Sequence, residues 1–476
     1  MIQYSFKTSG KTRTEHDLLG YKEVPEEALF GIQTLRAIEN FQISCHRLGD
    51  FVEFTKAFGI VKKGAALANH GLGLMSDEVK DAICQACDEL MEGKHTEHFP
   101  IDMIQGGAGT SCNMNANEVI ANRALEIMGK EHGAYEFVHP NDHVNMAQST
   151  NDAYPVAMHL GLYMMHFQIR EALDRLIAAF EAKGKEFADI IKMGRTQLQD
   201  AVPMTLGQSF DAFATALKSE AKKLDRASHE FLTINMGATA IGTGITAEPG
   251  YAESCTQFIK EISGWDITLA EDLVEATNDT SCMVGYSAAL KSLAIRVSKI
   301  CNDLRLMSSG PRTGLQEINL PPKQPGSSIM PGKVNPVIPE VMNQICFKVF
   351  GNDTTIAFAS EAAQLELNVM EPVLIESLVE SIQWLTAGFD TLRVECIEGI
   401  TANAQHCRHM VEHSIGIVTA LKPFIGYANS TEVAKEALET GGSVYQLVLD
   451  KGLLSKEQLD KIMDPKNMIK PTKIEL

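Results

Sequence analysis

One short segment, residues 324–336, concentrates the side chains that are best suited to chemistry. Its sequence is QPGSSIMPGKVNP, and it lies within a cluster of seven prolines that runs from Pro311 to Pro339. The glycines of the segment allow its backbone amides to face a ligand, and its lysine supplies the positive charge that an anion requires. A simple connection does not need this mixture of stiff and permissive residues, so we expect a functional loop. Its candidate site residues are Ser327, Ser328, Lys333 and Asn335.

Three other segments carry hydroxyl and amide side chains at close spacing. They are residues 106–115 (GGAGTSCNMN), residues 141–152 (NDHVNMAQSTND) and residues 194–203 (GRTQLQDAVP). Hydroxyls and amides can donate to a carboxylate or accept from an ammonium. Each such residue taken alone is more often a helix cap, so only their joint occurrence favours a binding site. The candidates are Thr110, Ser149, Thr150, Asn151 and Thr196.

The cysteines and histidines do not indicate a metal site. Cys84 and Cys87 have the CxxC spacing, but they lie in a predicted amphipathic helix without a second such pair or a nearby histidine pair. His406, His409 and His413 share one face of a predicted helix without a carboxylate partner, which is typical of an exposed surface. The ten scattered cysteines fit buried thiols in a reducing compartment.

The overall composition excludes several classes of protein. The chain has 476 residues, of which 45% are hydrophobic, so it can form a core and is not a disordered chain. No uninterrupted apolar stretch reaches the roughly 18 residues that a membrane span requires, and the N-terminus lacks the features of a secretory signal. The formal net charge of −19 argues against a nucleic-acid partner. We therefore expect a cytoplasmic protein that binds neither nucleic acid nor membrane.

Long helices must position the polar segments. Proline breaks helices, and five windows contain none: residues 156–202, 204–248, 250–310, 340–371 and 373–422. Apolar residues recur within them at steps of three and four, and this pattern extends from about Pro155 to Lys192. We expect helices of about thirty residues or more, roughly 45–55 Å long. Such rods need partners along their length, which favours burial against other subunits over a compact monomer.

We expect a mainly α protein with three parts. Residues 1–149 are rich in glycine and short helical runs, and they predict a mixed, mostly helical N-terminal domain. Residues 150–404 contain the long-helix windows and predict the central bundle. Residues 405–476 predict a small C-terminal domain, with a turn signal at Gly441-Gly442.

Taken together, the four polar segments resemble the motifs of the aspartase/fumarase superfamily. Residues 326–336 are similar to the family's signature loop, and the other three segments are similar to its substrate segments, in the same order along the chain. Four ordered motifs are far more specific than one, and the similarity covers essentially the whole chain. The resemblance implies a homotetramer with a twenty-helix central core and smaller N- and C-terminal domains.

The resemblance also implies cleavage of a carbon–nitrogen or carbon–oxygen bond that releases fumarate, with no required cofactor and no metal. A base removes a proton next to a carboxylate, and the resulting enediolate (aci-carboxylate) needs preorganised donors and positive charge. By its match to the signature loop, Ser327 is the general base, assisted by Lys333 and Asn335. Substrate binding falls to Thr110, Ser149, Thr150, Asn151, Thr196, Ser328 and Lys333. Each site is expected to draw on three subunits, and the loop glycines would permit closure over substrate.

Position 197 distinguishes two branches of the family. Class II fumarases carry histidine after the threonine, whereas this chain has Gln197, which cannot shuttle a proton. Hydroxide is a poor leaving group and benefits from a positioned acid. Gln197 therefore favours the carbon–nitrogen lyases that reversibly deaminate L-aspartate to fumarate and ammonia. Some amine-releasing members keep histidine at this position, so the hydration of fumarate to malate stays as the alternative.

Other features leave further alternatives open. Residues 138–142 (VHPND) resemble the segment by which fumarases form a secondary anion site, although His139 alone has an ordinary interpretation as a turn histidine. Arg36 either neutralises a substrate carboxylate or lies on a solvated helix surface. A catalytically silent structural member of the family, of the kind found in the eye lens, is a third alternative that the intact candidate residues argue against. Activation by a divalent cation is left undecided.

Overall fold

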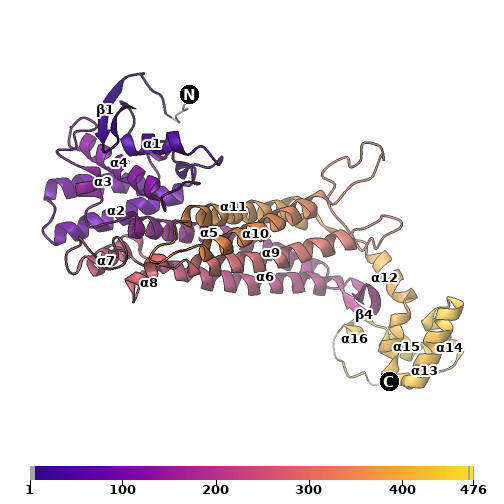
Figure 1. The fold of residues 1–476 in the computed structure, drawn as a ribbon. Helices are drawn as coiled ribbons and strands as arrows, with labels where there is room; N and C mark the ends of the chain where they lie inside the picture. Colours follow the sequence, from indigo (N-terminus) through magenta and orange to yellow (C-terminus); the bar gives the residue numbers. More distant parts are fainter. Residues whose placement is uncertain (1–5, 470–471, 475–476) are drawn as a thin grey trace. The chain divides into compact units, whose positions relative to one another are not determined.

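The computed structural model describes residues 6–469 and 472–474, and most of its regular structure is helical (Figure 1). Two-stranded sheets make up its β-strands in these residues. The prediction of a mainly α protein is confirmed. Over the same residues, we find no helix with both the length and the apolar character that crossing a membrane would require.

Five long helices lie mainly in the proline-free windows. They are α5 (Thr150–Glu186), α6 (Leu206–Ser228), α9 (Ser281–Met307), α10 (Val337–Glu361) and α11 (Glu371–Glu395). Helices α5, α10 and α11 each contain one proline in their first turns. Of the five, α5 has 37 residues, but the others have only 23 to 27. The predicted length is wrong for those four, because the windows also hold shorter elements. Helix α5 itself ends at Glu186 rather than near Lys192, since a β-hairpin begins at Ile191.

The chain divides into two compact units. Unit 1 comprises Met1–Arg170, Lys222–Ser292 and Lys348–Trp384, and unit 2 comprises Glu171–Ala221, Leu293–Phe347 and Leu385–Leu476. The divisions fall inside the long helices, so each unit contains a part of all five. The predicted domains 1–149, 150–404 and 405–476 stay a prediction.

In unit 1, helix α2 (Val52–Gly71) packs against α3 (Asp77–Met91) and α7 (Tyr251–Ser263). Most of α2 is buried and apolar, but Lys62 is also completely buried within it. The strands β1 and β2 form an antiparallel hairpin. The further elements of this unit are β1 (Thr12–Asp17), β2 (Gly20–Pro25), α1 (Ile32–Asn40), α4 (Thr110–Ile127), β5 (Thr233–Ile234), β6 (Thr268–Leu269) and α8 (Leu273–Asn278).

Polar contacts join the long helices within unit 1. The ring of His166 on α5 lies 3.2 Å from the hydroxyl of Tyr286 on α9. Ser287 on α9 donates to Asp353 on α10 at 2.9 Å. Asn352 on α10 donates to the carbonyl of Ser377 on α11 at 3.2 Å. Because these partners are buried or half-buried, their hydrogen bonds fix how the helices are rotated against one another.

Unit 2 contains a second antiparallel hairpin and the C-terminal helices. The hairpin consists of β3 (Ile191–Thr196) and β4 (Gln199–Thr205). The helices are α12 (Ala404–His413), α13 (Val418–Thr440), α14 (Val444–Asp450), α15 (Lys456–Ile462) and α16 (Pro465–Met468). Ile191 and Met193 of the hairpin belong to the same buried cluster as Val411, Leu421 and Val433 of these helices. The C-terminal helices therefore hold the hairpin by apolar burial.

Candidate active site

The loop that contains Ser327 lies between β7 (Ile318–Asn319) and α10, and it folds back on itself. Gly326 has φ +90°, and a Cβ atom there would lie 1.5 Å from the carbonyl oxygen of Lys333. Any side chain would thus collide with the backbone, so this position requires glycine. The close approach brings the backbone that precedes Ser327 next to the backbone of Lys333.

Two backbone donors converge on Ser327. Its Oγ accepts hydrogen bonds from the N–H groups of Ile329 at 3.3 Å and Met330 at 3.2 Å. A turn of this kind is common for serine. The same donors also stabilise negative charge on the oxygen, since hydrogen bonds to the charged form favour it.

Lys333 and Asn335 are paired within this loop. The ammonium Nζ of Lys333 donates to Asn335 Oδ1 at 2.8 Å, so the amide nitrogen of Asn335 points away from the lysine. Lys333 and Ser328 are exposed. The loop also exposes three apolar side chains: Ile329 (82%), Met330 (46%) and Val334 (49%). An exposed apolar group of this size is typical of a surface that meets another molecule.

In unit 1, Thr110 begins helix α4 directly after a tight turn. Gly107, Ala108 and Gly109 all have positive φ, and the Thr110 hydroxyl donates to the carbonyl oxygen of Gly107 at 2.7 Å. A Cβ atom on Gly109 would lie 2.4 Å from the ring of Tyr154 on α5. The turn thus fixes the start of α4 against the buried first turns of α5.

Ser149, Thr150 and Asn151 form the start of helix α5. The Oγ of Ser149 accepts from the N–H of Asn151 at 3.3 Å, which is a helix cap. The amide nitrogen of Asn151 donates to the carbonyl of Ala240 at 2.6 Å, so its Oδ1 faces the other way. Asn113 of α4 donates to Thr150 Oγ1 at 3.3 Å. The structure therefore brings the starts of α4 and α5 together.

Asp152 holds the glycine-rich segment that follows β5 against this helix start. Its fully buried carboxylate accepts from the N–H groups of Ser149 (2.9 Å), Gly237 (3.1 Å) and Thr239 (2.9 Å). Burial raises the pKa of Asp152 to about 6, and the backbone hydrogen bonds oppose this shift. Asp152 is the last residue of the polar segment 141–152, but the sequence of that segment did not indicate a role for it.

Thr196 lies at the tip of the hairpin in unit 2. Gln197 and Leu198 form its two-residue turn with φ +55° and +61°, and Thr196 pairs with Gln199. Two positive φ values in a two-residue loop are typical of a type I′ turn. Thr196 and Gln197 are both exposed, so the hairpin presents them outward.

The base of this hairpin is anchored by a buried carboxylate that the sequence analysis missed. Glu317 is 0% exposed and lies 2.7 Å from the ammonium of Lys192 and 2.5 Å from the guanidinium of Arg195. It directly precedes β7 and hence the loop. Nothing in its local sequence distinguishes it from a surface glutamate, because its partners are far away in the chain.

The predicted residues therefore form two groups. Thr110, Ser149, Thr150 and Asn151 meet in unit 1, and Thr196 lies in unit 2 with the four loop residues. The expectation that both groups act in one site stays a prediction.

Arg36 and His139 have structural partners. Arg36 makes two hydrogen bonds of 2.7 Å to Asp17, and this pairing raises the pKa of Arg36 and lowers the pKa of Asp17. His139 Nδ1 accepts from the N–H groups of Asn141 (3.1 Å) and Asp142 (3.2 Å), as a turn histidine does. Both residues line a cavity of about 620 Å³ in unit 1. The structure thus supplies a local partner for the Arg36 guanidinium and for the His139 ring without a substrate.

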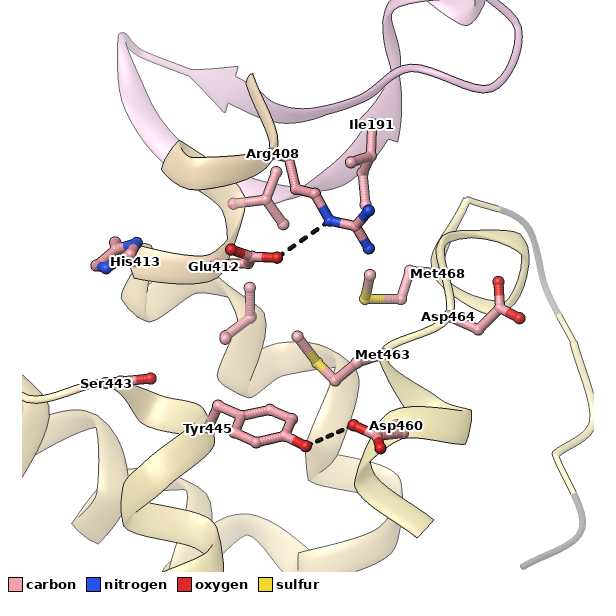
Figure 2. Close-up of a pocket in the computed structure, with 12 residues that line it drawn as sticks. Ile191, Arg408, Glu412, His413, Ser443, Tyr445, Asp460, Met463, Asp464 and Met468 are labelled. Atoms are coloured by element: carbon pink, nitrogen blue, oxygen red, sulfur yellow. Dashed lines mark hydrogen bonds and ion pairs between the residues drawn. The ribbon is translucent and has the colours of Figure 1, made fainter. Parts of the chain in front are cut away.

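A second cavity, of about 740 Å³, lies in unit 2 beside Ile191 and the C-terminal helices (Figure 2). Its polar side chains pair with one another: Arg408 with Glu412 at 3.1 Å, and Tyr445 with Asp460 at 2.5 Å. Its lining includes none of the predicted site residues, and we assign it no part in the site.

Metal ligands do not cluster in the described ranges, 6–469 and 472–474: no group of three or more His, Cys, Asp or Glu side chains there is arranged to hold an ion. Cys84 and Cys87 lie on α3, as predicted, and both are free thiols. The ring centroids of His409 and His413 lie 3.9 Å apart with the rings tilted by 38°, and His406 bonds to the carbonyl of Leu315 at 3.0 Å. These contacts agree with structural roles for the histidines.

Comparison with known proteins identifies the class. A family model described as "Lyase" matches residues 20–351, and one described as "Fumarase C C-terminus" matches residues 417–470. The helical fold and the ordered motifs agree with both matches. The chain belongs to the aspartase/fumarase superfamily of lyases.

Bacterial relatives narrow this class further. Aspartate ammonia-lyase from Pseudomonas aeruginosa is 56% identical over 466 residues, which cover 98% of each chain. The enzyme of that name from Helicobacter pylori is 53% identical and covers 96% of this chain and 98% of its own. The Escherichia coli enzyme is 53% identical over 97% of each chain. The predicted class of carbon–nitrogen lyase is confirmed by these relatives.

Two solved structures share the fold. A fumarate lyase:delta crystallin from Brucella melitensis, bound to cobalt, has a TM-score of 0.94 and 50% identity, over 97% of this chain and 100% of its own. A class II fumarase from Schistosoma mansoni has a TM-score of 0.90 and 32% identity, with the same coverage. Because one fold serves several branches, the choice among them depends on the site residues.

Proposed function

We propose that the protein catalyses the reversible deamination of L-aspartate to fumarate and ammonia. The observation that carries the proposal is the geometry at Ser327. Its Oγ accepts hydrogen bonds from two backbone N–H groups, and it lies in a loop whose backbone at Gly326 closely approaches that of Lys333. The relatives named aspartate ammonia-lyase support the choice of substrate.

Ser327, as an alkoxide, removes a proton from the carbon next to a substrate carboxylate. The electron pair of the broken C–H bond moves into that carboxylate and gives an aci-carboxylate with a second negative charge. The pair then returns to form the carbon–carbon double bond of fumarate, while the C–N bond breaks and its electrons leave with ammonia. The backbone amides of Ile329 and Met330 stabilise the ionised serine before the proton moves.

The positive charge and donors of the loop stabilise the intermediate. Asn335 turns its amide nitrogen outward because Lys333 binds its oxygen, so both side chains can face the charged carboxylate with Ser328. Removing one comparable donor from an enzyme of another class costs about 10²–10³ in rate. No cofactor is needed for these steps.

The remaining predicted residues hold the rest of the substrate. Ser149, Thr150 and Thr196 supply hydroxyls for the carboxylates, and Asn151 offers its Oδ1 to the ammonium group. Thr110 joins them when its hydroxyl hydrogen turns from the Gly107 carbonyl to the substrate. This division follows the amide orientation at Asn151, whose nitrogen is bound to Ala240. Gln197 supplies no titrating group, which favours an amine over hydroxide as the leaving group.

In this proposal the protein assembles as a cytoplasmic homotetramer, and each site draws on three subunits. The assembly brings the predicted residues of unit 1 in one subunit to those of unit 2 in another. The exposed apolar side chains of the loop support burial against another subunit. The long helices, with exposed Phe347 (59%) and Phe358 (72%) on α10, support a helical core shared by the subunits.

Fumarate absorbance distinguishes the alternatives. Purified protein is incubated separately with L-aspartate and with L-malate, and the reverse reaction is run with fumarate and ammonium. We expect fumarate from L-aspartate only. Fumarate from L-malate alone would indicate a fumarase, and no reaction with either substrate would indicate a structural member of the family.

A further inference from the structure

Lys62 lies beneath the starts of α4 and α5 and is completely buried. Its ammonium donates to three amide oxygens: Asn113 Oδ1 at 2.7 Å, Gln148 Oε1 at 2.8 Å and Asn145 Oδ1 at 3.1 Å. An ammonium has three hydrogens and no acceptor, so this set uses all of its donors. A buried lysine is costly, and an apolar side chain would fill the same space at lower cost. The charge therefore requires an explanation beyond packing.

The charged groups around Lys62 do not neutralise it by direct contact. Asp152 on α5 is the acidic group that favours its charged form, and the buried thiols of Cys87 on α3 and Cys255 on α7 are the further titratable groups near it. Burial lowers the pKa of Lys62 to about 7. The side chains that contact the ammonium directly are the three neutral amides, and each turns its oxygen toward Lys62.

This orientation is transmitted to Thr150. Because the oxygen of Asn113 faces Lys62, its amide nitrogen faces outward and donates to Thr150 Oγ1 at 3.3 Å and to Asn145 Oδ1 at 3.2 Å. Thr150 accepts from Asn113, so its own hydroxyl hydrogen must point elsewhere. Thr150 is half-buried at the start of α5, where its hydrogen can reach a ligand.

We infer that Lys62 is a positioning residue that acts through Asn113 to make Thr150 a hydrogen-bond donor to a substrate carboxylate. The inference rests on the proposed function and assigns a polarity to one of its binding residues. Lys62 itself touches no substrate. It sets the direction of a chain of hydrogen bonds that runs from the ammonium to the Asn113 amide and on to the Thr150 hydroxyl.

The decisive variant is Asn113→Asp, which keeps the size of the side chain and a partner for Lys62. It replaces the donor that faces Thr150 with an acceptor, so the Thr150 hydroxyl turns inward. We expect kcat/KM for L-aspartate to fall about 10- to 100-fold, mainly through KM, because one hydrogen bond to a charged group is lost. Asn117→Asp is the matched control: Asn117 lies one turn along α4, is equally buried and contacts Asn145, but not Thr150. It should keep nearly the kcat/KM of the native protein.

A double-mutant cycle separates positioning from general damage. Thr150→Ala is made in the native protein and in the Asn113→Asp protein, and Thr150→Ser serves as the conservative variant. We expect Thr150→Ala to lower kcat/KM at least tenfold alone but less than about twofold after Asn113→Asp, because the hydroxyl is already misdirected. Thr150→Ser should restore activity only when Asn113 is native.

Two results would overturn the inference: independent, additive losses in the cycle, or an unchanged KM in Asn113→Asp. If Thr150→Ala alone has no effect, Thr150 does not bind substrate and the inference is wrong. The proposed function is tested separately, by turnover of L-aspartate by the native protein. Should Asn113→Asp assemble poorly, Asn113→Ala, which removes the amide donor without adding charge, is carried through the same cycle, and it should likewise weaken the effect of Thr150→Ala.

Discussion

The same pairing of a lysine with an asparagine occurs in two regions of the molecule, one buried and one exposed. At the starts of α4 and α5, Lys62 binds the oxygen of Asn113 at 2.7 Å, and in the loop before α10, Lys333 binds the oxygen of Asn335 at 2.8 Å. In both pairs the lysine forces the amide nitrogen outward as a donor. Lys62 is fully buried, whereas Lys333 is exposed.

For the proposed site, this difference distinguishes a part that folding organises from a part that binding must complete. The buried network is fixed by packing inside unit 1, so its residues contribute to stability as well as to binding. The loop makes its contacts within itself and exposes apolar side chains, so its residues should affect catalysis with little effect on stability. Variants in the two regions should therefore fall into two classes.

The largest effect is expected at Ser327. Ser327→Ala removes the proposed base, and a positioned base contributes about 10²–10⁴ in rate, so kcat should fall at least about 10²-fold. The melting temperature should stay close to that of the native protein, because the side chain lies in an exposed loop. Ser328→Ala is the neighbouring control and should retain much more activity. Near-native turnover by Ser327→Ala would remove Ser327 from its role.

Two glycine variants compare the regions directly. Gly109→Ala would place a Cβ atom 2.4 Å from the buried ring of Tyr154, and Gly326→Ala would place one 1.5 Å from the Lys333 carbonyl. Gly109→Ala should lower the unfolding free energy by about 1–3 kcal/mol, because packing and positive φ both oppose it. Gly326→Ala should reduce kcat about tenfold or more by opening the loop, with a much smaller change in melting temperature.

The melting curves and initial rates of Gly109→Ala and Gly326→Ala show whether the two regions differ in this way. Equal losses of stability would contradict the distinction between an organised region and an exposed one. The same conclusion would follow if Gly326→Ala kept its full kcat.

The smallest effect concerns pH-dependent stability in unit 1. Glu118 is fully buried and accepts four hydrogen bonds at the start of α1, and burial raises its pKa from 4.5 to about 7. The folded protein therefore holds this proton to higher pH than the unfolded chain. Its contribution to stability is fully present below about pH 4.5 and is lost as pH rises through 7.

Glu118→Gln should flatten this part of the profile. We expect a lower melting temperature at acidic pH, because some hydrogen bonds are lost, but a weaker fall between pH 5 and pH 8. Glu26→Gln, at an exposed position, should keep the native slope. A Glu118→Gln profile parallel to the native one would show that Glu118 does not titrate in this range.

The elements with a regular pattern were predictable from sequence. Helices α5 and α11 follow from apolar residues at steps of three and four in windows without proline. The β3–β4 hairpin was not predictable in the same way, because its window also lacks proline. Its turn uses Gln197 and Leu198 at positive φ, where glycine or asparagine is the usual signal.

The exposed part of the proposed site has a clearer sequence signal than the buried part. Ser327, Lys333 and Asn335 stand out because their motif lies among glycines and prolines. Lys62 has no such signal: Lys63 adjoins it and lies at the surface of α2, paired with Asp88, while Lys62 is buried. Only the tertiary structure decides which of the two faces the amides of α4. Glu317 was missed for the same reason, since its partners lie more than a hundred residues away.

Complementation between subunits tests the central claim most directly, namely that the Ser327 loop of one chain acts with the Thr150 region of another. Ser327→Ala and Thr150→Ala chains, with different tags, are coexpressed in equal amounts, and hybrids are isolated by both tags. If Ser327 and Thr150 of one site come from different subunits, random assembly leaves both residues native in about a quarter of the sites. We predict that hybrids regain up to about that fraction of native turnover. Hybrids no more active than the two parent variants would contradict the account.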